Sequence, residues 1–110
     1  ALKMKSINLL IAIALLLLST SNLLAAGDAV AGKGTFGMCA ACHGVKGEGN
    51  QSMNAPRLAG QSDWYVVSSL KRFKSGVRGA KDPVAMTMVP MASKLSDQQM
   101  EDVAAYIKTL

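Results

Sequence analysis

The stretch Cys39-Ala40-Ala41-Cys42-His43 is the most informative part of the sequence about the fold. Its pattern, C-x-x-C-H, is the attachment signal for a c-type haem, in which both thiols add to vinyl groups and the histidine offers a nitrogen to iron. One helical turn separates the two cysteines, so both sulfurs can meet one porphyrin edge. The motif therefore predicts one haem c attached through Cys39 and Cys42, with His43 as an iron ligand.

The same two cysteines have three other uses: a disulfide, a thioredoxin-like redox pair, or half of a zinc site. Zinc would need two further Cys or His ligands, and the chain has only two Cys and one His in total. A thioredoxin-like pair belongs in a βαβ unit, yet no segment alternates with the period of a strand. A plain disulfide would place the single histidine beside it by chance. Haem attachment accounts for all three residues.

The N-terminal quarter has the layout of a secretory signal peptide. Two lysines precede an apolar run from Leu9 to Leu18, and polar and then small residues follow. The run has about half the length that a membrane span needs. Residues 1–25 are therefore expected to be an N-terminal extension and cleaved signal peptide that directs the chain to the periplasm. An uncleaved anchor is the alternative, because Leu23 and Leu24 lengthen the apolar segment.

Removal of this segment leaves one expected domain, residues 26–110, with a formal charge of +3 instead of +5. A domain of this size buries too little surface to be stable without extra core, which a haem supplies. The small positive charge and the few aromatic residues argue against nucleic-acid binding. We expect membrane contact only through membrane-bound partners.

Three helices are expected in this domain. The first runs from Asp28 to Ala41 behind an Asp N-cap, and the second from about Asp63 to Ser75, with Ser62 or Asp63 as its cap and Gly76 as its stop. The second helix is expected to place Trp64, Val67, Leu70 and Phe73 on one face. The stretches Gly44 to Gly60 and Gly76 to Pro90 are expected to be loops, because they are rich in Gly and Pro and have little periodicity.

The third helix has the clearest boundary signal. Ser96 and Gln99 have the spacing of a capping box, and Leu95 and Met100 the spacing of a hydrophobic staple. An apolar stripe follows at helical spacing, consisting of Val103, Tyr106, Ile107 and Leu110. This helix is therefore expected to pack in the core.

With this motif and these helices, the chain resembles the class I c-type cytochromes, and in particular one haem domain of the two-haem respiratory cytochromes c. The resemblance implies an all-α cytochrome c fold, with three to four helices and long loops wrapped around one haem. It also implies that the first and last helices cross. Gly32 and Phe36 are similar to the family's crossing pair in the first helix, and Val103 and Tyr106 to the pair that receives them in the last.

The second iron ligand is expected to be a methionine, because the chain has no second histidine and a thioether suits haem iron. The residues leave the choice open within the cluster Met86 to Met91. In the family the ligand lies in an extended loop shortly before the last helix, and Met88, eight residues before Ser96, is similar to it. Met91 is the first alternative and Met86 the second.

Three further residues are expected to contact the cofactor. The resemblance implies that the carbonyl of Pro56 accepts the N–H of the His43 imidazole and fixes its orientation. Arg57 and Trp64 are candidate donors to the haem propionates, since two carboxylates against an apolar pocket need partners. For Arg57 and Trp64, ordinary surface and core roles remain the alternative.

These expectations together predict a periplasmic one-electron carrier rather than an enzyme, because His43 and Met88 leave iron no open position for a substrate. Its partners are expected to be redox proteins of the respiratory chain. Five of the basic residues are clustered within eleven positions and could attract acidic partners: Lys71, Arg72, Lys74, Arg78 and Lys81. A simple solvated helix face is the alternative for this cluster.

Three other functions remain open. The chain could be the electron-accepting haem subunit of a periplasmic dehydrogenase or sulfur-oxidising complex, which would co-purify with a larger subunit. It could be a haem sensor, which would bind carbon monoxide when reduced. It could also be a disulfide-stabilised binding protein, which would be colourless.

Overall fold

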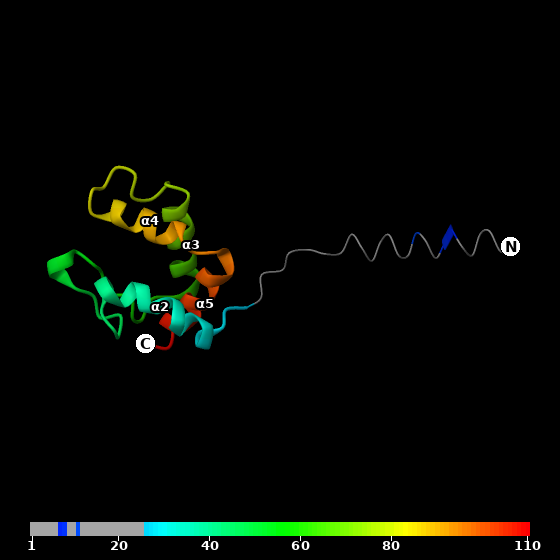
Figure 1. Ribbon diagram of the computed structural model, residues 1–110, viewed down its shortest axis with the longest axis horizontal. Coiled ribbons are helices and arrows are strands. Elements are labelled where there is room, and N and C mark those ends of the chain that lie inside the picture. Colours follow the sequence, from blue (N-terminus) through cyan, green and yellow to red (C-terminus); the bar gives the residue numbers. More distant parts are fainter. Residues whose placement is uncertain (1–6, 9–10, 12–25) are drawn as a thin grey trace.

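The computed structural model describes residues 7–8, 11 and 26–110 and shows a helical domain. The predicted signal peptide, residues 1–25, lies outside the described residues apart from positions 7, 8 and 11. No described helix is both long and apolar enough to span a bilayer. The elements of the domain are α2 (Ala29–His43), η1 (Gln51–Met53), α3 (Asp63–Lys74), η2 (Ala85–Thr87), α4 (Met88–Ser93) and α5 (Asp97–Ile107), where η marks a 3₁₀ helix (Figure 1).

Helix α2 begins at a side-chain cap and ends within the C-x-x-C-H motif. The Asp28 carboxylate accepts hydrogen bonds from the backbone N–H groups of Val30 (2.8 Å) and Ala31 (3.3 Å). The helix ends at His43, and Gly44 follows with a φ of 87°, in the left-handed region that favours glycine. The helix therefore ends two residues later than predicted, and it carries the whole motif in its last turn and a half.

Helices α2 and α5 cross in close contact, as the family resemblance implied (Figure 1). At Gly32 the backbones approach so closely that a Cβ atom would lie 1.9 Å from the carbonyl oxygen of Asp102. One turn further on, the rings of Phe36 and Tyr106 are 5.2 Å apart, at 57° to each other. Phe36 and Val103 are almost fully buried and belong to the main core cluster. The crossing pair is confirmed.

The predicted capping box of α5 is confirmed. The Ser96 hydroxyl oxygen accepts the backbone N–H of Gln99 at 3.1 Å, and the Gln99 side-chain oxygen accepts the backbone N–H of Ser96 at 2.9 Å. Leu95 and Met100, the residues of the predicted staple, are both buried. Helix α5 therefore begins at a firmly defined residue and presents its apolar side to the core.

Helix α3 packs against both α5 and α4, but its buried face differs from the predicted one. Val66, Val67 and Phe73 are buried, whereas Trp64 is 70% exposed. Successive residues of a helix are about 100° apart, so Trp64 lies about 120° around α3 from Leu70. If Leu70 is at the centre of the apolar face, Trp64 is at the edge of that face. The prediction that Trp64 belongs to the core face is therefore wrong.

The two predicted loops contain short elements. Residues 44–62 include η1 and an isolated bridge between Asn50 and Ala55. The second stretch was expected to be a loop up to Pro90, but η2 and then α4 begin before it ends. Pro90 is the third residue of α4, within the first turn, where a missing N–H costs no helical hydrogen bond. A six-residue helix is too short to show an apolar period, which explains why the sequence did not reveal it.

The domain extends in two arms from the packing of α3 on α5. In Figure 1, the C-terminal half of α2 and the loop after it form the lower arm, while the loop before α4 and α4 itself form the upper arm. The C-x-x-C-H motif therefore lies in one arm, and the methionines of α4 lie in the other.

Candidate functional site

The C-x-x-C-H motif occupies the C-terminal end of α2. Cys39 is half-buried and Cys42 is exposed, and both are free thiols. Burial raises the pKa of the Cys39 thiol to about 11. Because the cysteines are three residues apart on a helix, they lie on one side of α2.

His43 is held in a defined orientation by the loop that follows it. Its side chain is 6% exposed, and its Nδ1 lies 2.7 Å from the carbonyl oxygen of Pro56. A carbonyl can only accept, so Nδ1 carries the proton and Nε2 is the nitrogen with a free lone pair. The loop is itself anchored, because the N–H of Gly49 donates to the His43 carbonyl at 2.7 Å and the N–H of Leu58 to the Gly47 carbonyl at 2.8 Å. The structure therefore presents an imidazole with one nitrogen fixed and the other available to a metal.

The two candidate propionate donors are placed differently. The Arg57 side chain is exposed, and its Nε donates to the Ala59 carbonyl at 3.1 Å, within the same loop as Pro56. The exposed Trp64 stacks edge to face on Tyr65, with ring centroids 5.8 Å apart, at the start of α3. Neither placement tests a contact with a propionate, so both roles stay predictions.

The candidate methionine ligands lie in or just before α4. Met88 is the first residue of this helix and Met91 lies three positions later, so both share one side of it, and both are half-buried. Met86 is 47% exposed in η2, and Met53 is 51% exposed in η1, at the far end of the loop after His43. Met88 thus lies at a helix start rather than in the extended loop that was expected.

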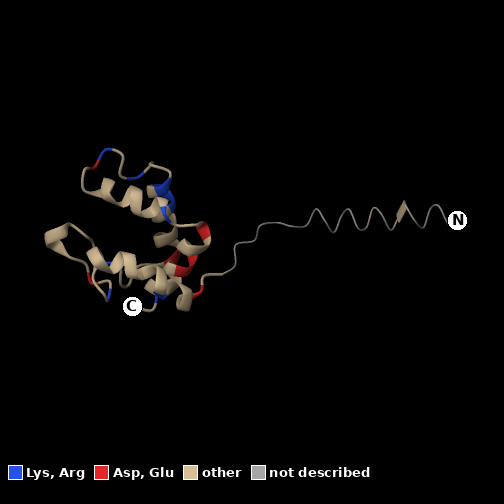
Figure 2. Ribbon diagram, in the orientation of Figure 1, with Lys and Arg blue, Asp and Glu red and all other residues tan. Residues whose placement is uncertain are grey.

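Some cations of the basic cluster at the end of α3 form hydrogen bonds within the protein. Figure 2 shows Lys and Arg in blue. The Lys74 ammonium donates to the Leu95 carbonyl at 2.5 Å. The Arg78 guanidinium donates to the Ser69 hydroxyl at 2.9 Å and lies 4.6 Å from the centre of the Phe73 ring. These two cations therefore brace α3, a role that spacing along the sequence does not show.

One buried acid that the sequence analysis did not single out joins the two crossing helices. The carboxylate of Asp102, in α5, accepts the backbone N–H of Asp28 at 2.9 Å and the side-chain amide of Gln98 at 3.0 Å. These hydrogen bonds hold the pKa of Asp102 below its ordinary value of 3.8. An acid six residues after the Ser96 N-cap carries no sequence signal for such a long-range contact.

The donor set of these arms fits a covalently bound haem. Two free thiols lie one turn apart, an oriented imidazole follows them directly, and neutral thioethers are available from the other arm. This is the donor set of a c-type haem, and an all-α domain with this motif is a c-type haem protein.

Comparison with known proteins gives the family. The family model described as Cytochrome c matches residues 29–110. Cytochrome c-554(548) from Halomonas halodenitrificans is 47% identical over 81 residues, which cover 74% of this chain and 94% of that protein. The chain belongs to the cytochrome c family, as a class I c-type cytochrome. It therefore carries haem c, bound covalently through Cys39 and Cys42, and acts as a haem-based electron carrier.

Two other relatives are longer than this chain. The crystal structure of reduced recombinant cytochrome c4 from Pseudomonas stutzeri is 44% identical, with a TM-score of 0.61, and the match covers 74% of this chain and 45% of that one. The protein named thiosulfate dehydrogenase electron acceptor, from Stutzerimonas stutzeri, is 39% identical over 72 residues, which cover 66% of this chain and 31% of that protein. This chain thus spans about half the length of the cytochrome c4 that it matches.

Proposed function

We propose that this protein is a periplasmic one-electron carrier of a respiratory chain, with His43 and Met88 as the two axial ligands of its haem iron, and that it is not an enzyme. The observation that carries this proposal is the 2.7 Å contact between Nδ1 of His43 and the Pro56 carbonyl. It fixes the imidazole on one side and leaves Nε2 for the iron. The signal-peptide pattern of residues 1–25 supports the location.

When bound, haem c supplies a one-electron Fe(III)/Fe(II) couple. The protein sets its reduction potential and shields it from small ligands. The Pro56 carbonyl accepts the Nδ1–H of His43 and so holds the imidazole in one orientation. Cys39 and Cys42 fix the cofactor to α2, so that both oxidation states meet the same surroundings. Arg57 lies in the Pro56 loop and is our candidate to hold a propionate, whose charge needs a cation in an apolar pocket. The Met88 thioether would be a second protein ligand to the iron, would leave no open position for small ligands and would raise the reduction potential.

Met88 is the methionine that best fits this role. It lies eight residues before the Ser96 cap, is half-buried, and begins a helix that α3 holds in place. Met91 shares the same side of α4 and provides a matched control, since both side chains are half-buried in one short helix. Met86 is more exposed and is the weaker alternative.

The experiment is the absorption spectrum of the protein matured in a periplasm, in wild type, Met88→Ala and Met91→Ala. The wild type is expected to show covalent haem c with the ferric methionine-sulfur charge-transfer band and no carbon monoxide binding when reduced. Met88→Ala is expected to lose the band and to bind carbon monoxide, whereas Met91→Ala keeps the wild-type behaviour. Loss of the band in Met91→Ala alone would transfer the ligand role to Met91. A wild type that lacks the band would refute His/Met ligation.

A second candidate function is an electron-accepting subunit of a periplasmic dehydrogenase or sulfur-oxidising complex. The similarity to the protein named thiosulfate dehydrogenase electron acceptor favours it. Gentle affinity purification of the tagged holoprotein from its native host distinguishes the two functions. Co-elution of a larger subunit in fixed proportion would support the complex, and elution of the haem protein by itself would support a free carrier.

The partners that we propose are redox proteins with acidic surfaces, which the basic residues at the end of α3 attract. Of the five clustered cations, Arg72 and Lys81 have no side-chain hydrogen bond or ion pair within the described part of the chain, whereas Lys74 and Arg78 are bonded to the fold. A complex held by such charges is weak and sensitive to salt, which suits a carrier that must dissociate after each transfer.

A further inference from the structure

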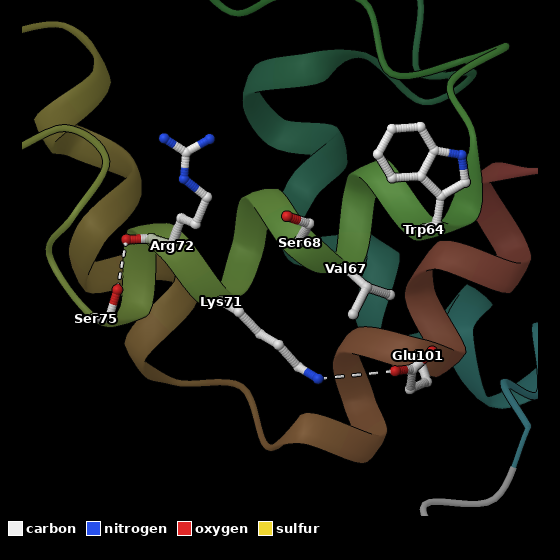
Figure 3. Close-up of a pocket in the computed structure, with 7 residues that line it drawn as sticks. All are labelled: Trp64, Val67, Ser68, Lys71, Arg72, Ser75 and Glu101. Carbon is white, nitrogen blue, oxygen red and sulfur yellow. Dashed lines mark hydrogen bonds and ion pairs between the residues drawn. The ribbon is translucent and has the colours of Figure 1, made fainter.

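A shallow groove runs between the outer side of α3 and the neighbouring part of α5 (Figure 3). Its hollow measures about 630 Å³ and is lined by Trp64, Val67, Ser68, Lys71, Arg72, Ser75 and Glu101. We call it the α3 groove. Five of the seven residues belong to α3, Ser75 is the C-cap of α3, and Glu101 belongs to α5, so one helix provides most of the surface.

The α3 groove has an apolar end and a basic end. Trp64, the only tryptophan of the chain, lies at the N-terminal end and is 70% exposed. Arg72 lies two turns further along, with the small side chain of Ser68 between them on the same side of α3 (Figure 3). Tryptophan and arginine are the residues that most often dominate binding energy at protein interfaces. This helix therefore exposes both types at once with an open surface between them.

The free charge of the groove is positive. The Arg72 guanidinium has no hydrogen bond or ion pair in the described part of the chain, and Lys71 makes only a long ion pair of 4.0 Å with Glu101. The acid at the start of the helix, Asp63, is neutralised by Lys108 at 3.0 Å. Lys74 donates to a backbone carbonyl and is not available to the groove. An occupant must therefore supply carboxylates at the Arg72 end.

We propose that the α3 groove is the docking surface for an acidic redox protein, with Trp64 as the apolar anchor and Arg72 as the charge that selects the partner. The proposal rests on the proposed function of an electron carrier, and it narrows the basic cluster to Lys71 and Arg72, the two of its cations that line the groove. Lys74 and Arg78, although close in sequence, do not line the groove: Lys74 donates to the Leu95 carbonyl and Arg78 to the Ser69 hydroxyl.

The test measures reduction of the ferric holoprotein by reduced flavodoxin, an acidic one-electron donor, in stopped flow. At an ionic strength of about 10 mM, where charges act over about 30 Å, Arg72→Glu is expected to slow the reaction about fivefold or more. Lys94→Glu is the matched control, because it makes the same charge change at an exposed residue after α4 that lies outside the groove. It is expected to slow the reaction less than about twofold. Equal slowing by the two variants would overturn the proposal, because net charge alone would then explain the effect.

A small neutral reductant, hydroquinone, separates this proposal from the proposed function. If wild type and Arg72→Glu react equally with hydroquinone and equally with flavodoxin, the electron carrier stands and the groove assignment fails. If the wild type holds no reducible haem, the proposed function itself fails. The expected result is equal rates with hydroquinone and unequal rates with flavodoxin.

Trp64→Ala tests the other end of the groove and decides between the two roles considered for the indole. A docking anchor predicts slower reduction by flavodoxin with an unchanged haem reduction potential. A propionate donor predicts a changed potential of the isolated protein, and that result would remove Trp64 from the docking surface.

Other occupants would also overturn the proposal. In sedimentation, self-association that Arg72→Glu abolishes would assign the groove to a second copy of the chain. Binding to vesicles with anionic lipid, lost in Arg72→Glu but not in Lys94→Glu, would assign it to a membrane surface. NMR shifts of the reduced protein on addition of oxidised flavodoxin are expected on α3, centred on the Trp64 indole N–H. Shifts confined to the C-x-x-C-H end of α2 would place docking elsewhere.

Discussion

Replacing Gly32 by alanine is expected to damage the fold more than any other single-methyl change in α2. The new Cβ would lie 1.9 Å from the carbonyl oxygen of Asp102, 2.5 Å from its carbonyl carbon and 3.0 Å from Cβ of Tyr106. Two of these three atoms belong to the backbone of α5, which cannot rotate away. The helices would have to separate by about 1 Å, the distance by which the closest contact falls short of 3.0 Å.

The magnitude follows from two opposing effects. Alanine gains about 1 kcal/mol over glycine in a helix interior, whereas forcing a methyl group into a packed contact costs about 1–3 kcal/mol and sometimes more. Separation of α2 from α5 would also loosen the Phe36–Tyr106 contact beside it. We expect a net loss of about 2 kcal/mol in the free energy of unfolding, or roughly 10 °C in Tm for a domain of this size.

Gly34→Ala provides the matched control, since it lies in the same helix with nothing within 4 Å of its added Cβ. It should stabilise the protein by about 0.5–1 kcal/mol through helix propensity alone. Guanidinium unfolding of both holoproteins at equal haem content, followed by circular dichroism, measures the two free energies. If Gly32→Ala proves as stable as Gly34→Ala, the glycine serves only to weaken the helix and the close crossing is not required.

Two further predictions concern α5. Ser96→Ala should lower the free energy of unfolding by about 1 kcal/mol, because it breaks the capping box. Ser62→Ala is the control and should change it by less than about 0.5 kcal/mol, because the Ser62 side chain makes no capping hydrogen bond. Thermal unfolding of both variants measures the two losses, and equal losses would contradict the prediction. The lowered pKa of Asp102 means that its ionised carboxylate stabilises the fold above the unfolded value near 3.8 and that this contribution disappears as the pH falls through the folded value. Wild type should therefore be more stable than Asp102→Asn at about pH 6, with the difference shrinking below about pH 4 in urea titrations, and a constant difference would refute the assignment.

The sequence predicted those parts of the molecule whose causes are local. The capping box at Ser96 and the N-cap at Asp28 depend on hydrogen bonds within one turn, and both helix starts are as expected. The haem attachment signal is equally local, because it requires only two thiols and an imidazole within five consecutive residues. The pairing of Gly32 with α5 was expected from the family resemblance rather than from periodicity.

The sequence misplaced features that depend on packing. Trp64 has a large apolar side chain of the kind expected in a core, but the packing of α5 and α4 on α3 leaves it exposed. Helix α4 is too short to carry a pattern of its own and forms where it can pack on α3. The roles of Lys74 and Arg78 likewise depend on a carbonyl and a ring brought near them by the fold.

What the sequence by itself determined is the chemistry of the motif: which thiols attach the cofactor, which imidazole is the candidate iron ligand, and where the first and last helices begin. These follow from covalent spacing and from hydrogen bonds that close within a few residues. The tertiary structure alone decided which side of α3 remains exposed and that Asp102 ties the start of α2 to α5. It also decided that, among the described residues, the Arg72 side chain has no partner, whereas Lys71 and Lys74 have one. The physical reason is that burial and long-range partners are set by how helices pack, and the period of one helix does not specify the elements that surround it.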